Sequence, residues 1–219
     1  RSMRRFQKGP WMKLIRMLVP VALVALATPA WSATLTYPGA APCNTTLQAC
    51  ITGAASGDVV EIATNAAIDE DLSINKSLTL RSAAGYTPTI GGGAPLRNLN
   101  YGGLGVSGSA ETLLIENLHF QRVTVHGYIY QASGHSITIR DNVFFLEIEH
   151  NNTPAIEIDT RVALTGVISG NRITSIGQGI RLWAITSALQ VVDYTVERNI
   201  VDTSLPAQSN AGIYVDFRG

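Results

Sequence analysis

Cysteine is scarce in this sequence: Cys43 and Cys50 are the only two among 219 residues. Two sulfurs without a nearby histidine do not supply the four ligands of a structural zinc site. If the chain is exported, the pair can form a disulfide across a short loop. The alternative is that Cys50 is a small apolar residue on a helix face and Cys43 is incidental. The sequence leaves both readings open and predicts no metal site.

Long apolar runs are also rare, and the main one lies near the N-terminus, at Met17–Ala27. It is too short to span a bilayer as a mature helix, and small residues precede Ala33 as at a cleavage site. Residues 1–32 therefore read as a secretory signal peptide, with an uncleaved anchor as the alternative. This predicts a secreted or cell-surface protein without a later membrane span. The basic residues that open the segment are Arg4, Arg5, Lys8, Lys13 and Arg16.

An excess of basic charge is missing once that segment is removed. The whole chain has 16 basic and 16 acidic residues, and six of the basic ones and none of the acidic ones precede Ala33. The remaining 10 basic and 16 acidic residues give a net charge of −6. Nucleic acid is excluded as a partner, because phosphate binding needs a basic surface. Residues 33–219 make up the length of one domain and can bury a sizeable core.

Familiar catalytic motifs are missing as well. The chain has no Gly-x-Ser-x-Gly, His-Glu-x-x-His or phosphate-binding loop. Each of the four histidines reads more readily as a surface or corner residue than as a general base. Whether the protein is an enzyme stays open. The four are His119, His126, His135 and His150.

Helical patterns are limited to one short stretch in the mature chain, Thr45–Ser56. Its apolar residues recur at helical spacing, Thr45 and Gln48 suggest a capping box, and Gly57 suggests a left-handed stop. The segments that follow alternate like strands. They begin at Asp58, where Val60 and Ile62 face one side, and continue in the runs Asp71–Ile74 and Ser77–Leu80. The glycine-rich stretch Ala83–Gly105 reads as a long loop with one strand near Thr89–Ile90.

A repeat organises the rest of the chain. An aliphatic residue stands three places before an asparagine four times, and the asparagines follow one another after 25, 29 and 28 residues. Such a period indicates stacked coils. Asparagine tolerates the left-handed backbone of a corner, and its amide can hydrogen-bond to equivalent residues above and below. We therefore expect a structural ladder of Asn117, Asn142, Asn171 and Asn199.

These features together resemble the right-handed parallel β-helix family, which includes pectate lyases, polygalacturonases and phage tailspikes. The resemblance is carried by the helix, the segments GDVVEIA and KSLTLRSA, the aliphatic-x-x-Asn corners and the Gly-Ile-x-aliphatic strands. It implies an all-β fold over residues 33–219: a β-solenoid of roughly six to seven coils, three strands each, with a short N-terminal capping helix. The sequence stops after a strand pattern without a cap, so we expect a C-terminal truncation.

The family resemblance does not settle an activity. The paired aspartates of polygalacturonases are absent, as are the clustered Ca²⁺-binding aspartates and matching base of pectate lyases. If the protein is an enzyme, the resemblance implies a polysaccharide lyase or glycoside hydrolase. The alternative is a non-catalytic, adhesin-like structural protein at the cell surface.

Aligning the last three Gly-Ile-x-aliphatic strands gives two columns of outward side chains, and these are the candidate binding site. An indole can stack on a sugar ring, and carboxylates bind hydroxyls or Ca²⁺. Asp159 and Asp216 would lie two rungs apart, roughly 10 Å, near the upper limit for inverting hydrolysis. The alternatives are an ordinary ion pair, solvated carboxylates and a tryptophan under a loop. Polysaccharide is the candidate partner, no cofactor is required, Ca²⁺ stays open, and the oligomeric state is not predicted. The columns are Glu157–Arg181–Tyr214 and Asp159–Trp183–Asp216.

Overall fold

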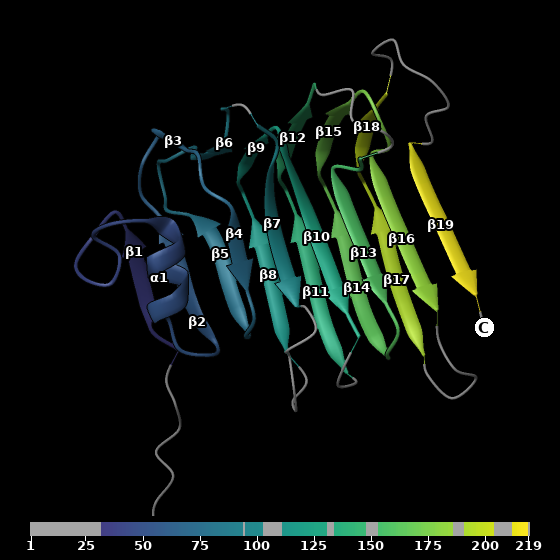
Figure 1. Ribbon diagram of the computed structural model, residues 1–219, viewed down its shortest axis with the longest axis horizontal. Helices are drawn as coiled ribbons and strands as arrows, with labels where there is room; N and C mark the ends of the chain where they lie inside the picture. Colours follow the sequence, from purple (N-terminus) through teal and green to yellow (C-terminus); the bar gives the residue numbers. More distant parts are fainter. Residues whose placement is uncertain are drawn as a thin grey trace, which may run out of the picture. The chain divides into compact units, whose positions relative to one another are not determined.

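Three parallel sheets make up the part of the chain that the computed structural model describes, namely residues 32–93, 95–102, 111–130, 134–147, 153–185, 191–203 and 212–218 (Figure 1). The predicted signal peptide lies outside the described residues, except for Ser32. His150 lies outside them too.

The strands of each sheet follow one another in chain order. Sheet A contains β1 (Thr34–Tyr37), β2 (Asp58–Ile62), β5 (Leu78–Ser82), β8 (Thr112–Glu116), β11 (His135–Arg140), β14 (Leu164–Ser169) and β17 (Val192–Glu197). Sheet B contains β3 (Ala67–Ile68), β6 (Thr89–Gly91), β9 (His119–Gln121), β12 (Val143–Leu146), β15 (Arg172–Ser175) and β18 (Ile200–Asp202). Sheet C contains β4 (Leu72–Ile74), β7 (Arg97–Gly102), β10 (Val123–Ile129), β13 (Ile156–Thr160), β16 (Ile180–Ile185) and β19 (Ile213–Arg218).

The chain visits the sheets in the order A, B, C six times between β2 and β19, and every pairing is parallel. The fold is therefore a parallel β-solenoid, which confirms the predicted all-β class. The stretch Ala83–Gly105 contains the strand expected near Thr89–Ile90, which is β6, but the prediction missed a second strand there, β7. Its glycines concealed the strand Arg97–Gly102, where the inward Leu99 and Tyr101 are fully buried.

Aliphatic columns run through the interior of the solenoid. On sheet A, Val60, Leu80, Ile115, Ile139 and Ile168 register on successive strands, and each is at most 1% exposed. Each such side chain contributes about 1.5–3 kcal/mol by leaving water. The stack therefore supplies the main stabilisation, and it explains why the strands read as short apolar runs.

The inward side chains of the last strand, β19, are not covered by a further coil of the described residues. Ile213, Val215 and Phe217 on β19 continue the buried columns of β16, yet they are 46%, 47% and 56% exposed. No strand of the described residues lies beyond β19 in sheet C.

An asparagine ladder occupies the corner between sheets A and B. The amide of Asn142 donates to Oδ1 of Asn171 at 3.1 Å, and that of Asn171 donates to Oδ1 of Asn199 at 2.9 Å. Each Nδ2 also donates to a main-chain carbonyl, as Asn171 does to Ile139 at 2.9 Å. Because Asn142 and Asn171 are 1% exposed, these bonds replace water that the amides have lost.

Asn117 is not part of this ladder, so the predicted first member is wrong. Leu118 occupies the equivalent place, and its main-chain N–H donates to Oδ1 of Asn142 at 3.0 Å. Asn117 lies one residue earlier, at φ 57°, as Asp141 does at φ 56° and Gly170 at φ 66°. The left-handed corner thus falls on the residue before each ladder asparagine. The ladder amides join the coils, and a different residue bends the chain.

The single described helix, α1 (Leu47–Gly53), is shorter than predicted and starts elsewhere. Its N-cap is Thr46, whose hydroxyl accepts from the N–H of Ala49 at 3.0 Å, so the Thr45–Gln48 capping box is wrong. The C-cap is Ala54 rather than Gly57. Leu47, Cys50 and Ile51 are buried, and the helix packs against β4 and β1.

Side chains tie α1 to the neighbouring coil. Gln48 Oε1 accepts from the N–H of Ser73 at 2.7 Å, and its Nε2 donates to the Ser73 carbonyl at 3.2 Å, so one amide pairs with the outer strand β4. Glu70 accepts from the first N–H groups of the helix, and Lys76 Nζ donates to the Ala54 carbonyl at 2.7 Å. Both charges suit the helix dipole. The helix therefore covers an open sheet edge, as expected of a cap.

A disulfide joins Cys43 to Cys50 and fixes the loop before α1 to the helix. Of the two alternatives that the sequence left open, the structure has the bonded one. Within the described residues, no helix has the length and apolar character needed to cross a membrane.

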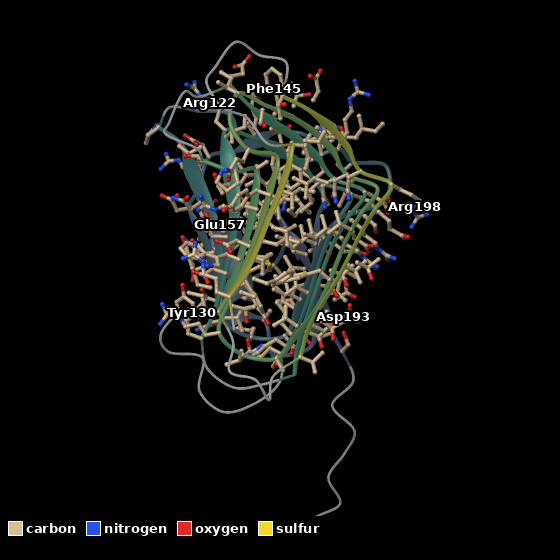
Figure 2. The ribbon with its side chains drawn as sticks, turned by 90° about the vertical axis from the view of Figure 1, so that its right-hand side faces the viewer. Arg122, Tyr130, Phe145, Glu157, Asp193 and Arg198 are labelled. Atoms are coloured by element: carbon tan, nitrogen blue, oxygen red, sulfur yellow. A yellow bond between two sulfur atoms is a disulfide. The ribbon has the colours of Figure 1, made fainter. Side chains whose placement is uncertain are left out.

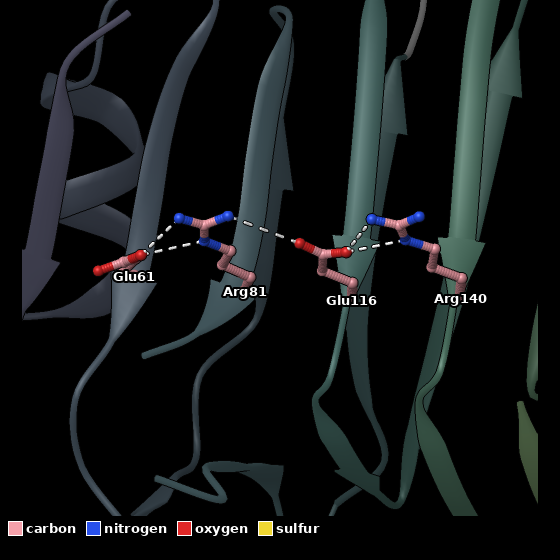
Figure 3. Close-up of polar contacts among 4 residues, drawn as sticks. All are labelled: Glu61, Arg81, Glu116 and Arg140. Atoms are coloured by element: carbon pink, nitrogen blue, oxygen red, sulfur yellow. Dashed lines mark hydrogen bonds and ion pairs between the residues drawn. The ribbon is translucent and has the colours of Figure 1, made fainter. Parts of the chain in front are cut away.

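A continuous ion-pair column follows the outer face of sheet A (Figure 3). Arg81 Nη2 lies 2.7 Å from Glu61 Oε1 and its Nη1 lies 3.8 Å from Glu116 Oε1. Arg140 Nη2 then lies 2.5 Å from the other oxygen of Glu116. Opposite charges alternate on consecutive strands, so each carboxylate in the column has a cationic neighbour.

Candidate functional site

Both predicted outward columns are present on sheet C in the predicted register. Glu157 pairs with Arg181, which pairs with Tyr214. Asp159 pairs with Trp183, and Trp183 with Asp216, in the same way. The structure therefore brings all six residues to one face. Figure 2 shows Glu157 on the flank opposite Asp193 of sheet A.

Strand β10 extends the two columns with residues that the sequence alignment did not assign. His126 registers with Glu157, and Tyr128 registers with Asp159. The run Tyr128-Ile129-Tyr130 fits more than one register in sequence, and the structure selects the one that puts Tyr128 beside Asp159. Tyr130 follows β10 directly and lies on the same flank (Figure 2).

Glu157 is the most buried charged residue of this face, at 5% exposure. Its Oε1 accepts from Nε of Arg181 at 3.0 Å and also pairs with Nη2, while its Oε2 lies 3.0 Å from Nδ1 of His126. Burial by itself raises the pKa of the carboxyl, but the hydrogen bonds and charges of His126 and Arg181 outweigh it, so the pKa lies below its ordinary value. Glu157 is thus an ionised, enclosed member of an ion-pair column.

Asp159 is bound on one oxygen only. The Tyr130 hydroxyl donates to its Oδ2 at 2.5 Å. Burial and this bond to a carboxylate raise the pKa of Tyr130, which keeps the phenol protonated as a donor. The other oxygen, Oδ1, is buried and has no hydrogen-bond partner among the described residues. A buried acceptor without a donor costs about 1–3 kcal/mol, so this oxygen lacks a hydrogen bond that a buried acceptor normally has.

Trp183 is half-buried and its indole ring is not freely open to solvent. The guanidinium carbon of Arg218 lies over the ring, 5.6 Å from its centroid, and Arg218 also pairs with Asp216 at 2.7 Å. The indole Nε1 is buried without a hydrogen-bond partner in the described structure. Neighbouring residues Asp159 and Trp183 therefore leave one acceptor and one donor unpaired.

Sequence reasoning missed the arginines and tyrosines that border these columns. Arg161 lies over the Tyr130 ring, 4.7 Å from the centroid. The rings of His126 and Tyr128 stack at 5.4 Å. The sequence signal was incomplete: Tyr128 and Tyr130 flank the apolar Ile129, which puts both tyrosines on the same face but does not say which face.

The other described histidines lie away from this face. His135 is buried at 2% exposure, with its Nδ1 3.5 Å from the Tyr101 hydroxyl. Glu111 is close to both, and burial raises the pKa of Glu111 and of Tyr101. His135 is therefore part of a buried polar cluster rather than the expected surface residue.

A cleft of about 380 Å³ lies elsewhere, beside the Asn117 corner. Tyr86, Asn117, His119 and Asp141 are among its lining residues, and none of them belongs to sheet C. His119 is exposed there, as the sequence suggested. The cleft thus does not overlap the outward columns.

No cation site forms from the usual ligands in the described ranges: three or more His, Cys, Asp or Glu side chains do not gather anywhere in them. On sheet C, Glu157 and Asp216 are each paired with an arginine. The arrangement suits hydrogen bonding and ring stacking better than cation binding.

A scan against protein-family models finds no match to this chain, and searches of curated proteins and of solved structures find no significant similarity. What the structure shares with the family named above is the parallel β-solenoid fold alone, so a function has to be argued from the residues.

Proposed function

We propose that this protein is a secreted or cell-surface β-helix protein that binds polysaccharide along the outer face of sheet C. The observation that carries the proposal is the concentration of amphipathic rings there. Trp183 is the only tryptophan of the described residues, and Tyr128, Tyr130 and Tyr214 account for three of the seven tyrosines in the chain. Such rings offer an apolar face for sugar rings together with a polar edge.

The proposal is for binding rather than cleavage. Hydrolysis by two carboxylates needs one to be a free acid and the other a free base or nucleophile. Asp216 is instead paired with Arg218, and Asp159 accepts a bond from Tyr130. The face therefore offers recognition groups, and the pectate-lyase-like resemblance enters only as support for a polysaccharide partner.

The disulfide supports the proposed location. Structural disulfides persist in oxidising compartments such as the periplasm or the cell exterior. Cys43 and Cys50 form one, and the N-terminal segment reads as a signal peptide. The net charge of −6 after removal of that segment argues against a nucleic-acid partner.

Affinity electrophoresis of the full chain tests the function. Native gels with entrapped neutral or acidic polysaccharides should retard the protein in at least one case. Trp183→Ala should lose most of the retardation because the ring platform is removed. Thr138→Ala, on the outer face of sheet A, is the matched control and should migrate like the wild type. Unchanged migration of the wild type in every gel would contradict the proposal.

A further inference from the structure

We propose that Trp183 and Asp159 together form a subsite that binds a hydroxyl group, and that the carboxylate at this subsite favours a neutral polysaccharide over a polyuronate. This inference rests on the proposed function and names its substrate class. It starts from the two polar atoms that the outward columns leave unsatisfied.

The two atoms are chemically complementary in a specific way. Nε1 of Trp183 can only donate, and Oδ1 of Asp159, whose other oxygen binds the Tyr130 hydroxyl, is an acceptor. Both atoms are buried without a partner in the described residues. The two residues are in register on adjacent strands, and neighbouring strands of a sheet lie about 4.8 Å apart. A group that satisfies both must accept one hydrogen bond and donate another. A sugar hydroxyl does this, whereas a carboxylate or sulfate cannot donate and an ammonium cannot accept.

The charges on the same face agree with a neutral ligand. Glu157 neutralises Arg181, and Asp216 neutralises Arg218. Asp159 itself is an acid at the subsite, so it repels an approaching uronate. Arg161 lies over the Tyr130 ring and is the cation that a uronate would use instead. Binding through Arg161 is therefore the competing outcome for the experiment.

Arg218 covers the subsite. Its guanidinium lies over the indole of Trp183 and pairs with Asp216, and its side chain is 64% exposed, so water can solvate it when it moves away. Since Nε1 and Oδ1 are buried, a ligand reaches them only when side chains around them move, and Arg218 is an exposed side chain that lies against the indole. Removing the cover should therefore strengthen the binding of a neutral ligand. If Arg218 instead held a ligand carboxylate, its removal would weaken binding.

The experiment measures affinity electrophoresis in gels containing soluble β-glucan or galactomannan, and in gels containing polygalacturonate or alginate. We expect retardation by a neutral polymer. Trp183→Phe keeps a ring but removes the N–H and should weaken binding about tenfold, the loss of one hydrogen bond to a ligand. Asp159→Ala should weaken it similarly, and Arg218→Ala should strengthen it. Thermal unfolding of each variant shows whether the fold is retained.

A second readout follows the indole directly. The Trp183 side-chain N–H resonance in a ¹⁵N-labelled sample, identified by its absence in Trp183→Phe, should move when a neutral polysaccharide is added. An unmoved resonance at saturation would mean that an ordered water satisfies the two atoms, and would overturn the inference. Retardation by acidic polymers alone would overturn it while leaving the proposed function intact. No retardation by any polymer would remove both.

Discussion

The outer faces of sheets A and C have the same architecture and differ in how completely their polar atoms are paired. On sheet A, the column from Glu61 to Arg140 alternates in sign, and each carboxylate meets an arginine on the next strand. On sheet C, Glu157 has comparable partners, but the adjacent column leaves an oxygen of Asp159 and the N–H of Trp183 unpaired.

The faces also differ in composition. The outward positions of sheet A carry threonine, serine, valine, leucine and charged residues and no aromatic ring among the described residues, whereas those of sheet C carry a tryptophan and tyrosines. In a closed column of ion pairs, the charged groups are already paired with one another and are not available to a ligand. Such a column stabilises the fold. A column with unpaired atoms beside rings can accept a ligand. The comparison therefore separates a structural face from a candidate binding face within one repeat geometry.

The largest effect should come from removing the enclosed carboxylate of sheet C. Glu157→Ala strands Arg181 and His126, whose side chains are only 26% and 13% exposed. We expect a loss of about 3 kcal/mol in the free energy of unfolding, as for a broken buried pair. Glu116→Ala leaves Arg140 without its carboxylate, whereas Arg81 keeps its pair with Glu61, and the two arginine side chains are 47% and 39% exposed. Water can solvate these, so we expect about half that loss in denaturant titrations; equal losses would remove this difference between the faces.

The asparagine ladder is also a column of mutually paired polar groups, and its members Asn142 and Asn171 are buried. Asn171→Ala removes the acceptor for Asn142 and the donor to the Ile139 carbonyl. Leaving these groups buried and unpaired should cost about 2 kcal/mol. Asn117→Gly is the control, because Asn117 is exposed and glycine keeps its left-handed backbone without strain. Denaturant unfolding should show little change in the free energy of unfolding for the control. A loss comparable to that of Asn171→Ala would mean that Asn117 is a member of the ladder after all.

The pH dependence of stability tests whether Glu157 is bound as the structure indicates. The pKa of Glu157 is lowered from its ordinary value of 4.5, so its contribution to stability is complete above that value and is lost as the pH falls through the folded-state pKa. Glu157→Gln removes this part of the acid limb. Unfolding free energies measured between about pH 6 and pH 3 should therefore fall more steeply for the wild type than for the variant. Parallel curves would contradict the binding of Glu157 by His126 and Arg181.

The smallest effect is expected at the outer end of the sheet A column. Arg140 is 47% exposed, and its pairing with Glu116 is screened by water. Arg140→Ala should cost less than about 1 kcal/mol and leave polysaccharide retardation unchanged. Both readouts are available from the same preparations. A loss of retardation here would place ligand binding on sheet A and reverse the comparison.

The register of the three last sheet C strands could be predicted because each contains the same Ile-x-aliphatic pattern after a glycine or an alanine. A one-residue slip there would expose every buried side chain, so the pattern admits one alignment. The residues around Tyr128 could not be aligned in the same way, because tyrosine fits either face. The strand Arg97–Gly102 was concealed by neighbouring glycines, and only its pairing with β4 and β10 revealed it.

The first asparagine corner shows a different limit. Leu114 and Asn117 have the same spacing as the later pairs, yet the inward residue there is Ile115, and Leu118 takes the ladder position. Two adjacent apolar residues made both registers plausible in sequence. Burial of Ile115 and Leu118, both 0% exposed, decided between them.

The sequence by itself determined the solenoid, because an apolar residue recurring once per coil can be buried only by stacking each coil on the next. It also determined which strands of the last three coils align. Only the tertiary structure decided which polar atoms are paired. A hydrogen bond depends on distances of a few tenths of an ångström between side chains from different coils, and residue spacing does not contain those distances. The unpaired N–H of Trp183 and oxygen of Asp159 could therefore be recognised only once the coils were stacked.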